Sequence, residues 1–146
     1  MFQKERDVEL MRLAIQMAFL SPPVDTAFCV GAVAVAEDGQ ILSTGYSREL
    51  PGNRHAEETC LTKLSPMEQL KVHTMYTTME PCGLRLSGRK TCAQRLLEAG
   101  VIKRVVVGIR EPGNVFVTEC VGEKMLKERG IVVDFLGDND PQMQGN

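Results

Sequence analysis

The sequence lacks several features that would place it in a specialised class of protein. No apolar run reaches the roughly 20 residues of a membrane-spanning helix, so we expect no membrane association. The charged start, Met1 to Asp7, does not have the layout of a secretory signal. No internal repeat and no interior low-complexity linker divides the 146 residues, which is the length of one ordinary domain.

The chain also lacks an excess of positive charge. It has 17 Lys and Arg against 19 Asp and Glu, a formal net charge of -2, whereas nucleic-acid binders usually show a basic excess. We therefore expect no nucleic-acid partner and favour a small anionic substrate. The five cysteines are an odd number without an export signal, which favours a reducing compartment, the cytoplasm. There, clustered cysteines more often bind metal or act in catalysis than form disulfides.

What the chain does contain suits a full hydrophobic core, since 43% of its residues are hydrophobic and 25% are charged. Apolar spacing, β-forming residues and turn residues predict helices that alternate with strands after a first hairpin, typical of the α/β class with a mixed sheet. The predicted helices are 8–20, 55–64, 91–99 and 119–129, and the predicted strands are 29–36, 41–46, 74–79, 104–109 and 131–135. We expect a domain over 1–136 and a loosely ordered tail over 137–146.

Four residues form the constellation that suggests chemistry. His55 and Glu57 stand at the start of a predicted helix, Cys82 follows a predicted strand, and Cys92 starts the next predicted helix. One histidine and two cysteines can hold Zn²⁺ and leave its fourth position open for water. Two residues apart on a helix, His55 and Glu57 would face nearly opposite sides, so they converge only on a metal over the helix end. We expect Glu57 to move protons as the catalytic residue.

Plainer interpretations apply to each residue taken singly. A lone histidine is more often structural than a ligand, and a glutamate in a first helical turn usually complements the helix dipole. A lone cysteine is usually a small buried hydrophobe, and we expect this of Cys29, Cys60 and Cys120. The joint occurrence of H-x-E with a proline–cysteine pair and a second cysteine is the known signature of zinc deaminases, and it favours the metal site.

With these motifs, His55-Ala56-Glu57 and Pro81-Cys82 with Cys92, the sequence resembles the cytidine deaminase superfamily. The resemblance covers nearly the whole chain. It implies a three-layer α/β/α cytidine deaminase-like fold with a five-stranded mixed sheet, a Zn²⁺ cofactor, hydrolytic deamination and a homodimer. Apolar residues of the first helix, such as Met11, Met17 and Phe19, are candidates for the dimer surface because they exceed the needs of one core.

One departure from the common pattern narrows the resemblance. Nine residues, Gly83 to Thr91, separate the two cysteines where two are usual, so they must form a loop that returns Cys92 to the metal. A long insert containing Gly-Arg resembles the pyrimidine deaminases of riboflavin biosynthesis, and Pro51-Gly52-Asn53 resembles their fungal branch. Alanine stands at position 27, where the bacterial enzymes usually have asparagine. The implied substrate is 2,5-diamino-6-ribitylamino-4(3H)-pyrimidinone 5′-phosphate.

Substrate contacts are expected beside the metal. Cations suit the phosphate, and the insert supplies Arg85, Arg89 and Lys90, although a solvated loop is an equal alternative for any single one. The Asn53 amide can bind a pyrimidine edge, the alternative being a helix N-cap. The backbone N–H of Ala56 or of Cys82 is a candidate donor to the developing oxyanion.

Several other functions stay open. A tRNA adenosine deaminase shares the metal chemistry but needs a positive surface, and a cytosine or nucleotide deaminase usually has a shorter insert. A non-catalytic partner subunit often lacks the glutamate, which is present here. A structural zinc module would want four protein ligands, and three are found.

Overall fold

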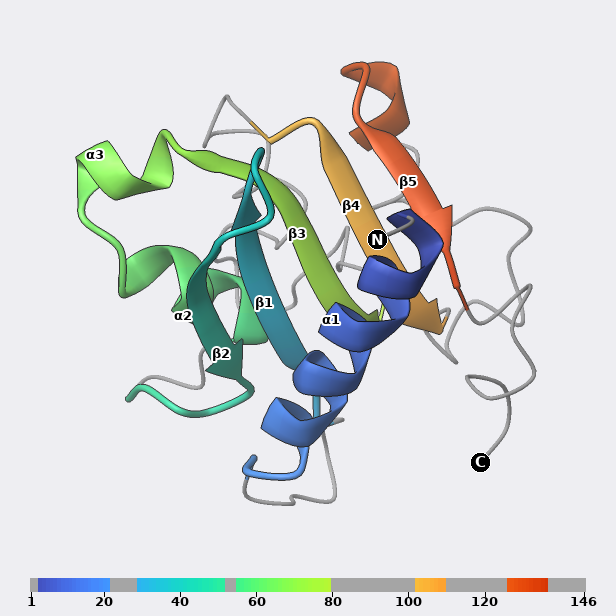
Figure 1. Ribbon diagram of the computed structural model, residues 1–146. Coiled ribbons are helices and arrows are strands. Elements are labelled where there is room, and N and C mark those ends of the chain that lie inside the picture. The colour runs from blue at the N-terminus through green and yellow to red at the C-terminus, as the bar shows by residue number, and fades with distance from the viewer. Residues whose placement is uncertain (1–2, 22–28, 52–54, 80–101, 110–125, 137–146) are drawn as a thin grey trace.

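The computed structural model of the protein describes residues 3–21, 29–51, 55–79, 102–109 and 126–136. These residues form the helices and strands of an α/β fold, as predicted (Figure 1). In chain order they are α1 (Gln3–Ala18), β1 (Gly31–Ala36), β2 (Ile41–Tyr46), α2 (Ala56–Thr62), α3 (Pro66–Gln69), β3 (Val72–Met79), β4 (Arg104–Ile109) and β5 (Val132–Phe135).

The five strands form one mixed sheet in the order β2-β1-β3-β4-β5. Strand β1 runs antiparallel to both β2 and β3, whereas β3, β4 and β5 run parallel to one another. The predicted five-stranded mixed sheet is therefore confirmed. The end of β3 and the start of β1 lie side by side in the interior of the sheet, where Thr77 pairs with Ala32.

Alternate residues of the central strands face two separate hydrophobic clusters, because successive side chains of a strand point to opposite faces. Helix α1 packs on one face and lies on the viewer's side of the sheet in Figure 1. Helix α2 packs on the other face. The α1 cluster contains Leu10, Met11, Ala14, Val33, Val35, Tyr76 and Val106, and the α2 cluster contains Ala32, Ala34, Ala56, Cys60, Met75, Val105 and Val107 among others. The predicted α/β/α layers are confirmed.

Two predicted boundaries were too narrow and one helix was not predicted. Helix α1 begins at Gln3 rather than Val8. The Gln3 side chain donates to Asp7 one turn later, and Asp7, although charged, is buried and hydrogen-bonded to Tyr76. Strand β3 begins at Val72 rather than Thr74. The helix that was not predicted is the short α3, which begins with a capping box between Ser65 and Glu68 and has Pro66 in its first turn.

The turn residues act as predicted. Asp38 and Gly39 connect β1 to β2, with the Gly39 N–H donating to Ala36 O at 2.9 Å and a φ of 93° at Gly39. At the far end of the chain, residues 126–128 are helical, and Gly130 N donates to Lys127 O at 3.0 Å at the predicted helix end. The predicted helix 91–99 and the tail 137–146 lie outside the described residues.

Across the described ranges, no helix is both long enough and apolar enough to span a bilayer. The apolar residues proposed for a dimer surface divide into two kinds. Met11 is fully buried in the α1 cluster and serves the core, so its assignment to a surplus surface was wrong. Met17 is half-buried, whereas Phe19, just after α1, is 83% exposed. The next residue, Leu20, was not among the candidates and is 59% exposed.

Candidate active site

The first helix turn of α2 carries the predicted H-x-E motif. His55 is the N-cap residue, with extended backbone angles (φ −78°, ψ 162°), and its carbonyl accepts the first helical hydrogen bond from Thr59 N at 2.9 Å. His55 is half-buried, whereas Ala56 and Glu57 are buried. As the N-cap residue, His55 lies just outside the helix, so its side chain does not follow the direction of a regular helical residue. The predicted metal site over the helix end requires this difference in direction.

A close approach between α2 and β2 fixes the position of this turn. A Cβ atom added to Gly45 would lie 2.6 Å from the Ala56 carbonyl oxygen and 3.0 Å from Cys60 N. Both contacts are to the backbone, which cannot rotate away. Glycine at position 45 therefore allows the start of α2 to lie directly against the sheet.

The Glu57 side chain reaches the end of β3. Its Oε1 atom accepts a hydrogen bond from the Thr77 hydroxyl at 3.0 Å, and both residues are buried, at 3% and 0% exposed. The Thr77 hydroxyl also lies 2.8 Å from the carbonyl oxygen of Met79, the last residue of β3. The predicted cysteine ligand, Cys82, follows three residues after Met79. Glu57 is thus joined to the strand that leads to a predicted ligand.

Sequence reasoning did not single out Thr77. A threonine is an ordinary β-former, and nothing distinguishes it locally from Thr74 or Thr78. A weak signal was available, because Thr77 shares its face with Met75 and pairs with Ala32 and Val107, all apolar and buried. A hydroxyl among apolar neighbours requires a polar partner.

Most of the other predicted site residues lie outside the described residues. These are Asn53, Cys82, Arg85, Arg89, Lys90 and Cys92. Among the described side chains, no group of three His, Cys, Asp or Glu residues is arranged to hold a metal. Of the predicted site, the structure brings together His55, Ala56 and Glu57 at the start of α2.

Two cysteines lie among the described residues, and they differ in burial. Cys60 is fully buried in the α2 cluster, and burial raises the pKa of its thiol well above its usual range, so the predicted structural role is confirmed. Cys29 is exposed, which contradicts the expected buried position. Its thiol lies 3.7 Å from Ser21 O and 3.5 Å from an Arg48 guanidinium nitrogen, so polar contacts replace the apolar packing that was expected. Cys120 lies outside the described residues.

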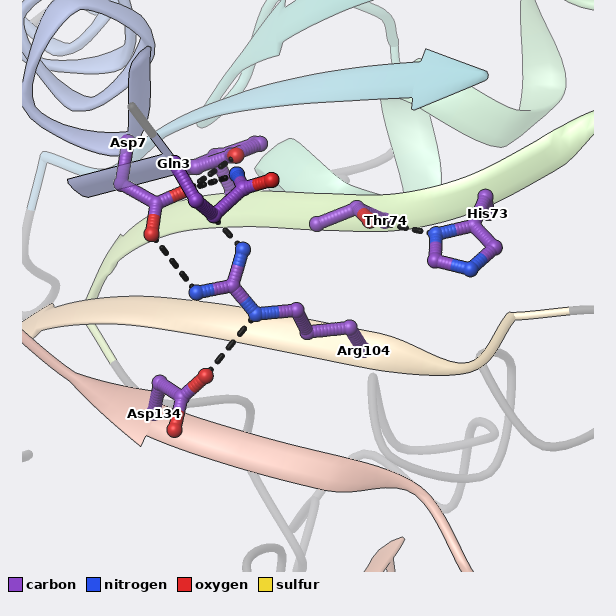
Figure 2. Close-up of polar contacts among 7 residues, drawn as sticks. Gln3, Asp7, His73, Thr74, Arg104 and Asp134 are labelled. Atoms are coloured by element: carbon purple, nitrogen blue, oxygen red, sulfur yellow. Dashed lines mark hydrogen bonds and ion pairs between the residues drawn. The ribbon is translucent and has the colours of Figure 1, made fainter. Parts of the chain in front are cut away.

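A second polar cluster lies on the α1 face of the sheet (Figure 2). The Arg104 guanidinium donates to both carboxylate oxygens of Asp7, at 2.9 and 2.6 Å, and its Nε donates to Asp134 at 2.8 Å. Gln3 and Tyr76 also donate to Asp7 Oδ1, at 2.8 and 2.5 Å. Burial alone would raise the pKa of Asp7, but the hydrogen bonds from Arg104, Tyr76 and Gln3 outweigh it and lower that pKa. This cluster ties α1 to β3 and β4.

The residues described at the start of α2 fit a zinc-binding role. A half-buried imidazole at a helix N-cap is an ordinary zinc ligand, and a buried carboxylate two residues on is placed to handle protons beside it. The thiols of Cys82 and Cys92 would complete a donor set of one nitrogen and two sulfurs.

The strand order, the two helical layers and the H-x-E turn at the start of α2 define a cytidine deaminase-like α/β protein. The chain belongs to the cytidine and deoxycytidylate deaminase zinc-binding family, whose pattern it matches over residues 4–109.

Individual relatives agree with this assignment. The chain is 46% identical to diaminohydroxyphosphoribosylamino-pyrimidine deaminase of Schizosaccharomyces pombe over 128 residues, which are 86% of this chain and 31% of that protein. It is 35% identical to riboflavin biosynthesis protein RibD of Aquifex aeolicus over 135 residues, 90% of this chain and 35% of that protein. Among solved structures, the Aspergillus oryzae Rib2 deaminase in complex with DARIPP superposes with a TM-score of 0.74 and 33% identity, covering 90% of this chain and 84% of that chain.

The chain spans about a third of the length of the two curated relatives, 31% and 35%. Its similarity to the Rib2 deaminase structure is more complete, because the match covers 84% of that chain. The region that matches the family, residues 4–109, contains the H-x-E turn of α2.

Proposed function

We propose that this protein is a zinc-dependent hydrolase that deaminates 2,5-diamino-6-ribitylamino-4(3H)-pyrimidinone 5′-phosphate in riboflavin biosynthesis. The products are 5-amino-6-ribitylaminouracil 5′-phosphate and ammonia. The observation that carries this proposal is the buried Glu57 at the start of α2, two residues after His55, in a chain 46% identical to a pyrimidine deaminase.

In this mechanism His55, Cys82 and Cys92 hold the zinc, and Glu57 moves the protons. Bound zinc would supply Lewis-acid activation of the attacking water at neutral pH. Glu57 accepts a proton from the water and delivers it to the unprotonated ring nitrogen beside ring carbon 2 as that carbon is attacked. Glu57 then delivers the second proton to the departing amine, so that water and the amine become the new carbonyl and ammonia. Burial of Glu57 suits this role because it excludes competing solvent.

The substrate is held by residues around the helix start and by the insert between the cysteines. We assign the pyrimidine edge to Asn53, the developing oxyanion to the backbone N–H of Ala56, and the phosphate to Arg85, Arg89 or Lys90. Ala56 is the first residue of α2, so its N–H has no helical acceptor. Arginine suits a phosphate because its planar guanidinium can bind two oxygens.

Ammonia release from a panel of substrates tests the proposed activity. The panel contains the phosphorylated riboflavin intermediate, cytidine, cytosine, dCMP and a tRNA anticodon loop. We expect turnover of the riboflavin intermediate at least about a hundredfold above that of every other member, a ratio that polar contacts to a substrate can supply. Faster deamination of the tRNA loop or of a free nucleotide would replace this proposal with one of the other deaminase activities.

We also propose a homodimer that works in the cytoplasm. The exposed Phe19 and Leu20 at the end of α1 support the dimer, because exposed apolar patches commonly mark protein contacts. Cys29 and Cys60 are free thiols, which suits a reducing compartment. Light scattering at micromolar concentration should give twice the mass of the chain, 16.1 kDa, and a monomer would overturn the dimer.

A further inference from the structure

Thr77 occupies a position where the fold alone would accept an apolar residue. It lies in the middle of the sheet, where its partners across β1 and β4 are Ala32 and Val107. Its face of β3 also carries Met75, which belongs to the α2 cluster. Valine has nearly the same shape as threonine and an equal preference for strands. The hydroxyl of Thr77 therefore has no packing role in the sheet, and what it contacts accounts for its presence.

The contacts of this hydroxyl point to Glu57. The Thr77 Oγ1 atom is 3.0 Å from Glu57 Oε1 and 2.8 Å from Met79 O, and Thr77 is fully buried. A hydroxyl has one proton, so it serves one of these two acceptors at a time. Either acceptor satisfies it. The bond to Glu57 can therefore form and be released without leaving a buried donor unpaired, which would be costly.

We propose that Thr77 is a positioning residue that fixes the Glu57 carboxylate for proton transfer. A glutamate side chain has three rotatable bonds, and a reacting group must be held within a fraction of an ångström of its working position. The bond from Thr77 selects one orientation of the carboxylate relative to the end of β3. This inference rests on the proposed role of Glu57 as the proton carrier.

The test compares variants that separate the hydroxyl from the shape of the side chain. Thr77→Val removes the hydroxyl and keeps the branched shape, whereas Thr77→Ser keeps the hydroxyl. Thr59→Val is the matched control, because Thr59 is a fully buried threonine on α2 whose hydroxyl has no hydrogen-bond partner within the described part of the chain. For each variant we would measure zinc content, thermal unfolding, and kcat and KM with the phosphorylated pyrimidine.

We expect Thr77→Val to lower kcat about ten- to a hundredfold, the effect of losing one hydrogen bond to a charged group, with KM within about twofold and zinc unchanged. Thr77→Ser should recover most of the kcat, and Thr59→Val should match the wild type. A kcat within about twofold of wild type in Thr77→Val would overturn the inference. Equal losses in Thr77→Val and Thr77→Ser would also overturn it, because the shape and not the hydroxyl would then matter.

A double-mutant cycle with Glu57→Leu gives a second measure that needs no substrate, because leucine, unlike glutamine, has no oxygen to accept the bond. The unfolding of Thr77→Val, Glu57→Leu and the double variant should show coupling between the two sites, and additive effects would contradict the bond. Thr77→Ala replaces Thr77→Val in the cycle if the valine variant does not fold. The two hypotheses fail differently. An active Glu57→Gln variant would remove the proton-carrier role itself, whereas an inactive Glu57→Gln beside a fully active Thr77→Val would remove only the role of Thr77.

Discussion

The Tyr76 hydroxyl donates a 2.5 Å hydrogen bond to Oδ1 of Asp7, a residue 69 positions earlier in the chain. The bond crosses from β3 to α1, and Arg104 of β4 closes on the same carboxylate. Asp7 is 3% exposed, so its charge is compensated by these donors rather than by water. The attachment of α1 to the sheet thus depends on a buried charge as well as on apolar packing.

Replacement of this charge should destabilise the protein. Breaking a buried ion pair costs about 3–5 kcal/mol, and we expect about 2–3 kcal/mol for Asp7→Asn because Arg104 is partly exposed and keeps Asp134. Urea unfolding at pH 7 measures this loss. Glu9→Gln is the control on the same helix, since Glu9 pairs with Arg6 in an exposed ion pair and should cost less than about 1 kcal/mol.

The lowered pKa of Asp7 gives this effect a pH dependence. Its contribution to stability is fully present above the ordinary aspartate pKa of about 3.9 and is lost as the pH falls below that value. The difference between wild type and Asp7→Asn should therefore hold down to about pH 4 and shrink as the pH falls further. An equal difference at pH 7 and at pH 2.5 would show that Asp7 acts through packing alone.

The metal assignment predicts one zinc per chain. Elemental analysis of the purified protein should give about one equivalent, and a Cys82→Ala, Cys92→Ala double variant should lose it, because a three-ligand site cannot retain zinc on one imidazole. Cys29→Ser is the matched control, since Cys29 is an exposed cysteine outside the proposed ligand set. Full zinc retention in the double variant would refute the assignment.

The proton-carrier role predicts a specific loss in Glu57→Gln. General acid–base groups contribute about a hundredfold or more to rate, so kcat should fall by at least that factor while zinc content and fold are kept. Glu58→Gln is a matched control at the next position, because Glu58 is equally buried, at 2% against 3% exposed. Near-normal turnover in Glu57→Gln, or equal losses in both variants, would count against the role.

The position of α2 should be sensitive to the size of the side chain at position 45 of β2. Gly45→Ala places a methyl group 2.6 Å from the Ala56 carbonyl oxygen, so α2 must move, and overpacking of this kind costs about 1–3 kcal/mol. We expect kcat to fall as well, because Glu57 moves with the helix. Ser43→Ala, two residues earlier on the same strand, removes atoms instead of adding them. If Gly45→Ala behaves like Ser43→Ala in stability and rate, the contact does not position the site.

The insert between the cysteines should bind the substrate's phosphate. At least one of Arg85→Ala, Arg89→Ala and Lys90→Ala should lose about ten- to a hundredfold in preference for the phosphorylated over the dephosphorylated substrate, the value of one charge-assisted contact. Lys103→Ala is the control, because Lys103 is an exposed cation at the opposite end of the sheet from Glu57. Unchanged preference in all three variants would place the phosphate site elsewhere.

Sequence patterns predicted the sheet well because its strands are bounded by turn residues. The limits of β2 and β4 agree with prediction, and Gly39 makes the predicted turn. The helix ends were harder to place, because burial of Asp7 depends on Tyr76 and Arg104, far along the chain. The Ser65 to Glu68 capping box of α3 was visible in the sequence and was not recognised.

The candidate site was likewise predictable from local sequence only in part. The position of His55 at a helix start follows from local sequence, and the burial of Glu57 agrees with its expected role. The partnership of Glu57 with Thr77 arises from the packing of α2 on β3, which no local pattern encodes.

Tyr76 and Thr77 are consecutive residues with partners on opposite sides of the sheet, Asp7 on α1 and Glu57 on α2. Since a strand repeats every two residues, sliding β3 by one position would move each of its side chains to the opposite face of the sheet. A slide that carried Tyr76 to the position of Thr77 would set a phenol against Glu57 and bring Met75, which has no hydroxyl, to face Asp7. A single inserted or deleted codon within β3 would therefore damage stability and catalysis together, whereas substitutions that keep the strand's length affect them one at a time.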